Sequence, residues 1–269
     1  MTRLLNRFRK CCTRNMKFKL NLKREIKIVA VLAVLFALIA FTERMKGDAT
    51  VSAVQVRMDN VHENHYLDEN DVLALMDIDT DNLKGSDLSK LNFSDVEHRI
   101  RQSPYVKDAQ LFSDLKGNLT VKVSLRRPIA RMVWNEGPDA YIAEDGTIMP
   151  VSQKFSSRVV LISGPFVQTL LTSSNILEMD EGRQLMLMFN SIHDDSFWSA
   201  QIAQIDLDSK ARATLFVQVG DERIEFGKPD NLEVKFKKLK IFYKEILPRV
   251  GWNKYDRINV EYAGQVVAE

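Results

Sequence analysis

The chain has 269 residues and a formal net charge of only +2, but this charge is unevenly distributed. Residues 1–27 hold ten Lys or Arg and a single acid, so this segment carries +9 and the remainder carries −7. A nucleic-acid-binding domain places its positive charge on a folded surface, so a basic head on an acidic body argues against that class. We expect no nucleic-acid partner.

Both cysteines, Cys11 and Cys12, lie in the basic head. The rest of the chain has no thiol, which excludes a disulfide framework and a cysteine-ligated metal site there. Palmitoylation of the adjacent pair is an alternative, but two free reduced thiols are the simpler interpretation.

An uninterrupted apolar run, IVAVLAVLFALIAF, occupies residues 28–41. Its length is short for a membrane span and would also suit a signal peptide or a core helix. The dense positive charge before the run and the mixed charge after it favour a span with a cytoplasmic N-terminus. The basic segment is long for a signal peptide, and no A-x-A cleavage site follows. We expect a cytoplasmic tail at 1–27, a transmembrane signal anchor at 28–42 and a linker at 43–50.

The segment after the linker mixes strand and helix patterns. Apolar and polar residues alternate over 54–58, which predicts a strand. Asp68 is a candidate N-cap for a helix with apolar residues over 72–76. Ser94 to Glu97 matches the S-x-x-E capping box and predicts a second helix, ended by Pro104.

Two further strands are expected at 106–113 and 119–125, joined by a turn at 116–118. The order β-α-α-β-β over residues 51–127 predicts one small α+β unit in which a helix pair covers a short sheet.

Residues 128–269 show the pattern of a mostly antiparallel β domain with flanking helices, so the overall fold class is α+β. A hairpin is expected around the Asp145-Gly146 turn. The final strand is expected where Ile258, Val260 and Tyr262 alternate. The other expected elements are strands at 159–162, 202–207, 214–219 and 223–226, and helices at 185–192 and 232–246, the second ended by Pro248 and Gly251.

Motifs for chemistry are scarce. His62 and His65 are the only closely spaced histidines, and Glu63 and Asp68 lie near them, but this segment looks more like a polar loop than a metal site. The sequence lacks H-E-x-x-H, G-x-S-x-G and the glycine-rich phosphate-binding loops. We expect no catalytic, cofactor-binding or metal site.

Five short motifs follow one another along the chain. They are QSPYVKDA (102–109), LTVKV with RRPIA (119–130), YIAEDG (141–146), FGK (226–228) and NVEYAGQVV (259–267). This ordered set, behind a basic head and an apolar run, resembles the FtsQ/DivIB family of cell-division proteins, specifically its Bacteroidetes-type members. The resemblance covers nearly all of residues 26–269, although Leu125 and Ala143 stand where many members have Glu and Asp.

The resemblance implies a POTRA domain at 51–127 and an FtsQ-type β domain at 128–269. It also implies a non-enzymatic scaffold of the bacterial inner membrane, single-pass, with its C-terminus in the periplasm at the division septum. The implied partners are FtsB and, through it, FtsL. The POTRA domain is expected to contact other division proteins, and residues 28–42 the lipid bilayer.

The last strand is the candidate partner site. A strand at a sheet edge offers unpaired amide and carbonyl groups to which a partner strand can add. The resemblance implies a partner-contacting role for Tyr262, with Gly264, Gln265, Val266 and Val260 beside it. The alternative is that these are ordinary core and edge residues. Trp252, just before this strand, either anchors the helix end against the sheet or lies exposed at the interface, and the packing role is favoured.

Two other functions compete with a scaffold. One is a membrane-tethered cell-wall enzyme, which would need a nucleophile or a metal-ligand set that the sequence does not display. The other is a POTRA-type component of outer-membrane translocation. Such components carry several POTRA units, whereas only one is expected here.

Overall fold

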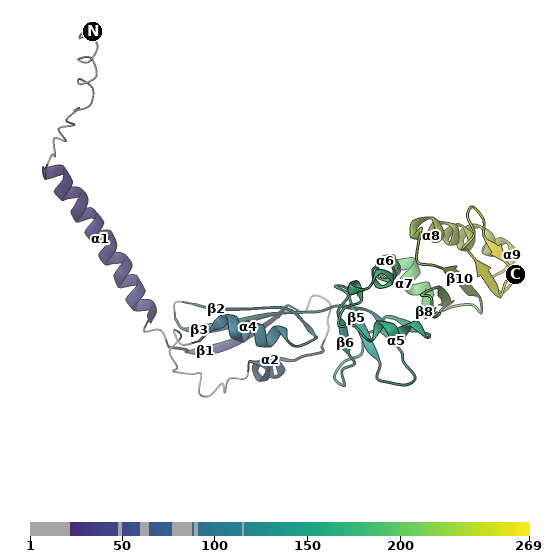
Figure 1. The fold of residues 1–269 in the computed structure, drawn as a ribbon, viewed down its shortest axis with the longest axis horizontal. Helices are drawn as coiled ribbons and strands as arrows, with labels where there is room; N and C mark the ends of the chain where they lie inside the picture. The colour runs from purple at the N-terminus through teal and green to yellow at the C-terminus, as the bar shows by residue number, and fades with distance from the viewer. Residues whose placement is uncertain (1–21, 48–49, 60–64, 77–87, 89–90, 115) are drawn as a thin grey trace, which may run out of the picture.

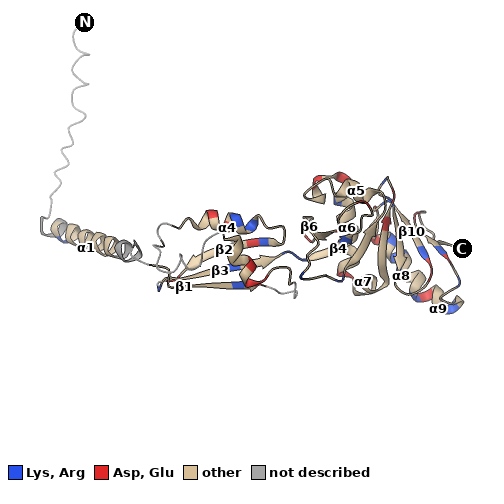
Figure 2. Ribbon diagram, turned by 90° about the horizontal axis from the view of Figure 1, so that it is seen from below, with Lys and Arg blue, Asp and Glu red and all other residues tan. Residues whose placement is uncertain are grey.

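The computed structural model describes residues 22–47, 50–59, 65–76, 88, 91–114 and 116–269. A long helix is followed by two units, each built on its own β-sheet (Figure 1). Basic and acidic positions are interspersed over both units, for example on α4 (Phe93–Arg101), as Figure 2 shows.

Helix α1 (Leu22–Gly47) contains the apolar run. The large apolar side chains from Ile26 to Phe41 are exposed along it. The helix also continues through residues 43–47, where a linker was expected. Within the described part of the chain, no helix combines the length and the apolarity that a membrane crossing requires. The anchor at 28–42 stays a prediction.

The first unit follows the predicted order β-α-α-β-β among its described elements. These are β1 (Ala53–Asp59), α2 (Glu69–Leu75), α4, β2 (Val106–Ser113) and β3 (Asn118–Leu125). β3 lies between its two neighbours, parallel to β1 and antiparallel to β2. Leu119, Val121 and Val123 of β3 are fully buried and pack in one core with residues of both helices. The strict alternation in the sequence thus marks the covered face of this sheet.

The helix start predicted at Asp68 is confirmed. The Asp68 carboxylate accepts a hydrogen bond from the Asp71 amide at 2.9 Å, and the Asp71 carboxylate accepts one from the Asp68 amide at 2.8 Å. This reciprocal pair satisfies two amides that the helix itself leaves unpaired.

The capping box predicted at Ser94 is wrong. Helix α4 starts two residues earlier, at Phe93, with Asn92 as an N-cap that makes no side-chain cap bond. The Glu97 carboxylate accepts instead from the Leu111 amide on β2 at 2.7 Å, and from Arg101 at 3.0 Å. The Leu111 amide, which the sheet leaves unpaired, competes with the helix N-terminus for this carboxylate. The S-x-x-E motif gives no information about such a distant competitor.

The second unit is built on a nine-stranded sheet with the order β12-β11-β10-β9-β8-β7-β4-β5-β6. Five neighbouring pairs are antiparallel and three are parallel, so the domain is mostly antiparallel, as predicted. The parallel pairs are β4–β7 and β7–β8 near the centre and β10–β11 near the C-terminal edge. The strands are β4 (Pro128–Met132), β5 (Ala140–Ala143), β6 (Ile148–Pro150), β7 (Val160–Ser163), β8 (Ile202–Leu207), β9 (Ala213–Val217), β10 (Arg223–Gly227), β11 (Arg257–Asn259) and β12 (Val267–Ala268).

Helical segments complete this unit and bury its core. They are α5 (Phe166–Leu170), the short η2 (Ile176–Glu178), α6 (Asp180–Asp194), α7 (Ser196–Gln201), α8 (Leu232–Ile241), the π-helical η3 (Phe242–Ile246) and α9 (Leu247–Val250). Trp198 of α7 lies 5.3 Å from the Phe236 ring of α8 and 6.0 Å from that of Tyr243. Phe236 in turn lies 5.1 Å from Phe226 of β10. These buried rings fix α8 on the sheet.

The end predicted for the last long helix is confirmed at Gly251 and wrong at Pro248. Pro248 lies in the first turn of α9, a position at which proline is common. The helical path continues to Val250 and stops at Gly251, whose φ is 105°. The π-helical turn η3 shifts the helix phase. Ile246, expected on the apolar face, is therefore 38% exposed.

An aromatic cluster joins the two units. Tyr66 of the first unit is 2% exposed and stacks on Tyr105 at 5.4 Å. Its ring also meets Tyr141 and Phe155 of the second unit edge-on, at 5.9 and 5.1 Å. The Tyr66 hydroxyl donates to the Ser157 hydroxyl at 2.8 Å.

Ion pairs surround this cluster. Lys154 Nζ lies 3.0 Å from Asp68 and 2.5 Å from Asp71, so the N-terminal cap of α2 is tied to the second unit. Lys107 pairs with Glu144 at 2.6 Å on the same junction. These pairs are largely exposed, so each contributes little by itself, and the buried aromatic contacts dominate.

The junction should weaken at high pH. Burial raises the pKa of Tyr66 to about 12, because the phenolate is disfavoured away from water. The folded-state pKa thus lies above the unfolded value of 10.0. The neutral Tyr66 hydroxyl therefore stabilises the folded protein fully at a pH below the unfolded-state pKa. This contribution is lost as the pH rises through the folded-state pKa.

The measurement is urea unfolding of wild type and Tyr66→Phe from pH 8 to 12. We expect wild type to lose stability more steeply than the variant above pH 10. Tyr262→Phe, at a ring exposed to solvent, serves as the control and should follow wild type. Equal slopes for Tyr66→Phe and wild type would contradict this account of the junction.

Candidate protein-binding site

The C-terminal edge of the nine-stranded sheet differs from its predicted form. The expected strand over 258–262 ends at Asn259, and β12 pairs antiparallel with it on its outer side. β11 is therefore an inner strand, parallel to β10, and β12 is the edge. The reversal comes from the turn after Val260, where Gly264 adopts a left-handed backbone with φ of 72°.

In β12, the backbone amide and carbonyl of one residue, Ala268, point away from the sheet. The Glu269 and Arg257 backbones exchange two hydrogen bonds, of 3.0 and 3.2 Å. Bonded and non-bonded pairs alternate in an antiparallel ladder, so Val267 bonds inward to Asn259 and Ala268 does not bond to Ile258. The amide and carbonyl of Ala268 thus point away from β11, where an added strand would meet them.

The predicted partner-contacting residues lie together around this edge but differ in exposure. Val260 is fully buried, so its side chain belongs to the core. Tyr262 is 55% exposed, and Gly264 and Gln265 are exposed with it. Val266 is partly buried and packs against the main core. The partner-binding role of all five stays a prediction.

Lys238 of α8 holds the turn that carries Tyr262. Its ammonium donates to the carbonyls of Val260 and Tyr262 at 2.7 Å each and of Gln265 at 3.2 Å. Burial, followed by nearby Lys235, lowers the pKa of Lys238. One side chain thus closes the loop between β11 and β12 by satisfying three backbone carbonyls.

Replacing Lys238 with methionine should release this loop. We expect amide hydrogen exchange at residues 261–266 to rise by about tenfold or more, because the loop loses all three hydrogen bonds from the ammonium. Lys237→Met, on an exposed neighbour in the same helix, is the matched control and should leave the rates unchanged. Unchanged exchange in Lys238→Met would show that the ammonium does not hold the loop.

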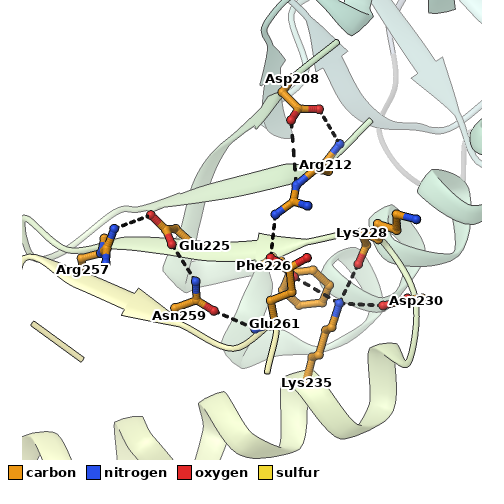
Figure 3. A network of polar contacts seen from close by, with 10 residues as sticks. All are labelled: Asp208, Arg212, Glu225, Phe226, Lys228, Asp230, Lys235, Arg257, Asn259 and Glu261. Atoms are coloured by element: carbon orange, nitrogen blue, oxygen red, sulfur yellow. Dashed lines mark hydrogen bonds and ion pairs between the residues drawn. The ribbon is translucent and has the colours of Figure 1, made fainter. Parts of the chain in front are cut away.

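A polar network extends across the last strands (Figure 3). Arg212 of the β8–β9 turn contacts Glu261 at 2.6 Å. The Glu261 amide donates to Asn259 at 2.9 Å, and Asn259 donates to Glu225 of β10 at 2.7 Å. Arg257 of β11 lies 3.3 Å from Glu225 and 3.0 Å from the Glu269 side chain. The edge is therefore held in register by side chains as well as by backbone pairing.

A buried lysine anchors α8 next to this network. Lys235 is 5% exposed, and its ammonium donates to the carbonyls of Phe226 and Lys228 at 3.1 and 2.7 Å and to Asp230 at 2.7 Å. The ammonium also lies 5.0 Å from the centre of the Phe226 ring. Figure 3 shows it reaching the carboxyl end of β10 from α8.

Trp252 does not pack as the sequence analysis favoured. It is 55% exposed, and its nearest aromatic neighbour is Tyr243 at 6.5 Å. The left-handed backbone at Gly251 turns the chain away from the helix just before this residue, which leaves the indole at the surface.

The structure bears little on the weaker metal hypothesis. His62 and Glu63 lie outside the described residues. Across the residues that are described, no group of three or more His, Cys, Asp or Glu side chains is arranged to hold a metal ion.

Sequence reasoning missed two residues of this site. Ala268 has no side-chain signal, because its importance comes from the direction of its backbone groups. Lys238 is one of several lysines in α8, and the sequence does not show which of them faces the turn.

Two family models match this chain. A family model described as FtsQ/DivIB, C-terminal related, matches residues 127–269, and one described as a POTRA-like domain matches residues 50–124. No curated protein matches the chain. The first match covers more than half of the chain, so this protein belongs to the FtsQ/DivIB family and is a cell-division protein. That family consists of non-enzymatic division scaffolds.

Proposed function

We propose that this protein is a divisome scaffold of the bacterial inner membrane that binds FtsB, and through it FtsL, by strand addition at β12. The observation that carries the proposal is the outward-facing Ala268 backbone of an edge strand, with exposed Tyr262 in the turn that leads into this strand. Backbone pairing would set the partner's register, and the tyrosine would supply a side-chain anchor. Gly264, Gln265 and Val266 form the surrounding surface, and Val260 supports it from the core.

The membrane arrangement is part of the same proposal. Residues 28–42 anchor the chain in the bilayer, residues 1–27 stay in the cytoplasm and the sheet-containing part is periplasmic, at the division septum. The exposed apolar side chains between Ile26 and Phe41 and the basic head support this orientation. Residues 43–50 connect the anchor to a POTRA domain at 51–127 and a β domain at 128–269.

The POTRA domain contacts other division proteins in this proposal. Its sheet has two outer strands, β1 and β2, and Phe112 on β2 is 48% exposed. An outer strand with an exposed aromatic ring offers a contact surface to a second partner.

The test is a titration of the full-length chain in detergent micelles against purified extracytoplasmic segments of the cognate FtsB and FtsL. We expect saturable binding of FtsB, and recruitment of FtsL only when FtsB is present. Absence of FtsB binding by the folded chain would refute the proposal.

A further inference from the structure

A hollow lies away from the β12 edge. It has a volume of about 730 Å³ and opens beside β4, β7 and β8. Its polar lining consists of Arg127, Arg131, Ser157, Arg158, Ser199 and Gln218, together with His193. No Asp or Glu is among its lining residues, all of which lie in the described part of the chain. The acidic character of the chain beyond residue 27 makes this concentration of arginines notable.

The topology brings the arginines together. β4 is parallel to β7, and β7 is parallel to β8. The amino-terminal ends of all three strands therefore lie on the same side of the sheet. Arg127 immediately precedes β4, and Arg158 lies two residues before β7. Arg131 lies within β4 itself.

Part of the lining is held rigidly. Asp139 binds the Arg131 guanidinium at 2.6 and 3.2 Å, and the guanidinium carbon lies 5.7 Å from the centre of the Tyr141 ring. The segment before β7 is held through its side chains: the Tyr66 hydroxyl donates to the Ser157 hydroxyl, and the Tyr141 and Ser156 hydroxyls are hydrogen-bonded to each other. A ligand would therefore meet donors that are already positioned.

Asp139 neutralises Arg131, but the charges of two other arginines of the hollow are not paired. Neither Arg127 nor Arg158 forms an ion pair with any residue that the structure describes. An adjoining hollow contains Glu144 and Asp145 and also Asp194. The first two of these acids are already paired, with Lys107 at 2.6 Å and Arg126 at 2.9 Å. A bound anion would relieve the repulsion between the arginines.

We propose that this hollow binds a phosphate or diphosphate group. Guanidinium groups match phosphate oxygens with two parallel hydrogen bonds, and the hydroxyls and the amide supply further donors. A diphosphate offers many acceptor oxygens to a lining that is rich in donors, whereas a single carboxylate offers only two. The volume is within the range of small-molecule sites.

The test is calorimetric titration of sodium pyrophosphate into the full-length chain in detergent micelles at low ionic strength. We expect saturable binding, weakened by about tenfold or more in the double variant Arg127→Gln/Arg158→Gln, because each arginine supplies charge-assisted hydrogen bonds. Arg223→Gln, at an exposed arginine of β10 outside the hollow, is the control and should bind as wild type does. Thermal unfolding midpoints of all variants establish that they are folded.

A second experiment distinguishes a lipid headgroup from a soluble diphosphate as the natural ligand. Tighter binding to phosphatidylcholine vesicles containing farnesyl diphosphate than to pyrophosphate alone would assign the site to a lipid headgroup. Equal binding would assign it to a soluble diphosphate. No saturable pyrophosphate binding, or equal binding by wild type and the double variant, would overturn the proposal. So would a glutamate-rich peptide that binds in the hollow where pyrophosphate does not.

Discussion

Replacing Lys235 with methionine should lower the free energy of unfolding by about 2–4 kcal/mol, one of the two largest effects expected here. Methionine keeps much of the buried stem but removes the ammonium. The carbonyls of Phe226 and Lys228 then lose a charged donor, and Asp230 loses its ion-pair partner. The aromatic packing of Phe226 against the ammonium is lost as well.

Denaturant unfolding of the full-length chain measures this change. Lys244→Met is a matched control, because Lys244 is exposed on the same helical path, and its effect should stay within about 0.5 kcal/mol. Since Lys235 fixes α8 to the end of β10, its loss should also loosen the Lys238 loop. A Lys235→Met variant as stable as wild type would show that this buried ammonium is not a structural anchor.

The second large effect concerns binding. Tyr262→Ala should weaken the affinity for FtsB by about 2 kcal/mol, roughly 30-fold, because an exposed tyrosine at the centre of an interface is a typical hot spot. The turn should survive the change, since Lys238 holds it through backbone carbonyls and not through the Tyr262 ring.

The control is Phe112→Ala, which removes a similarly exposed aromatic ring from the first unit. Its affinity for FtsB should match wild type. Circular dichroism of both variants checks the fold. If Tyr262→Ala and Phe112→Ala bind FtsB equally well, the partner site lies elsewhere on the protein.

Most of the fold could be predicted from the sequence because short-range patterns of apolar and capping residues define its helices and strands. The alternation in β3 and the apolar spacing of α6 each match a buried face. The Asp68 cap succeeded because both of its partners lie within one helical turn. The family motifs led to the FtsQ/DivIB assignment, which the family models support.

The misses have long-range causes. Glu97 was assigned to a local cap, but it binds the backbone of β2, a strand whose position the sequence pattern does not give. Pro248 was interpreted as a stop, yet a proline at the start of a helical turn is compatible with α9. The edge strand was misplaced because the Gly264 turn folds the last residues back onto β11.

The candidate site was predicted in outline and not in detail. Tyr262, Gly264 and Gln265 are exposed near the edge, as a partner surface requires, while Val260 is buried. The contributions of Ala268 and Lys238 depend on the backbone direction in β12 and on a contact between α8 and a distant turn. Neither property is encoded in local sequence pattern.

Amide hydrogen exchange of the full-length chain, with and without FtsB, tests strand addition at β12 most directly. The Ala268 amide faces the free edge, whereas that of Val267 already pairs with β11. Strand addition predicts that FtsB slows exchange at Ala268 by about 100-fold or more while Val267 changes little. Saturating FtsB that leaves the Ala268 exchange rate unchanged would contradict binding at this edge.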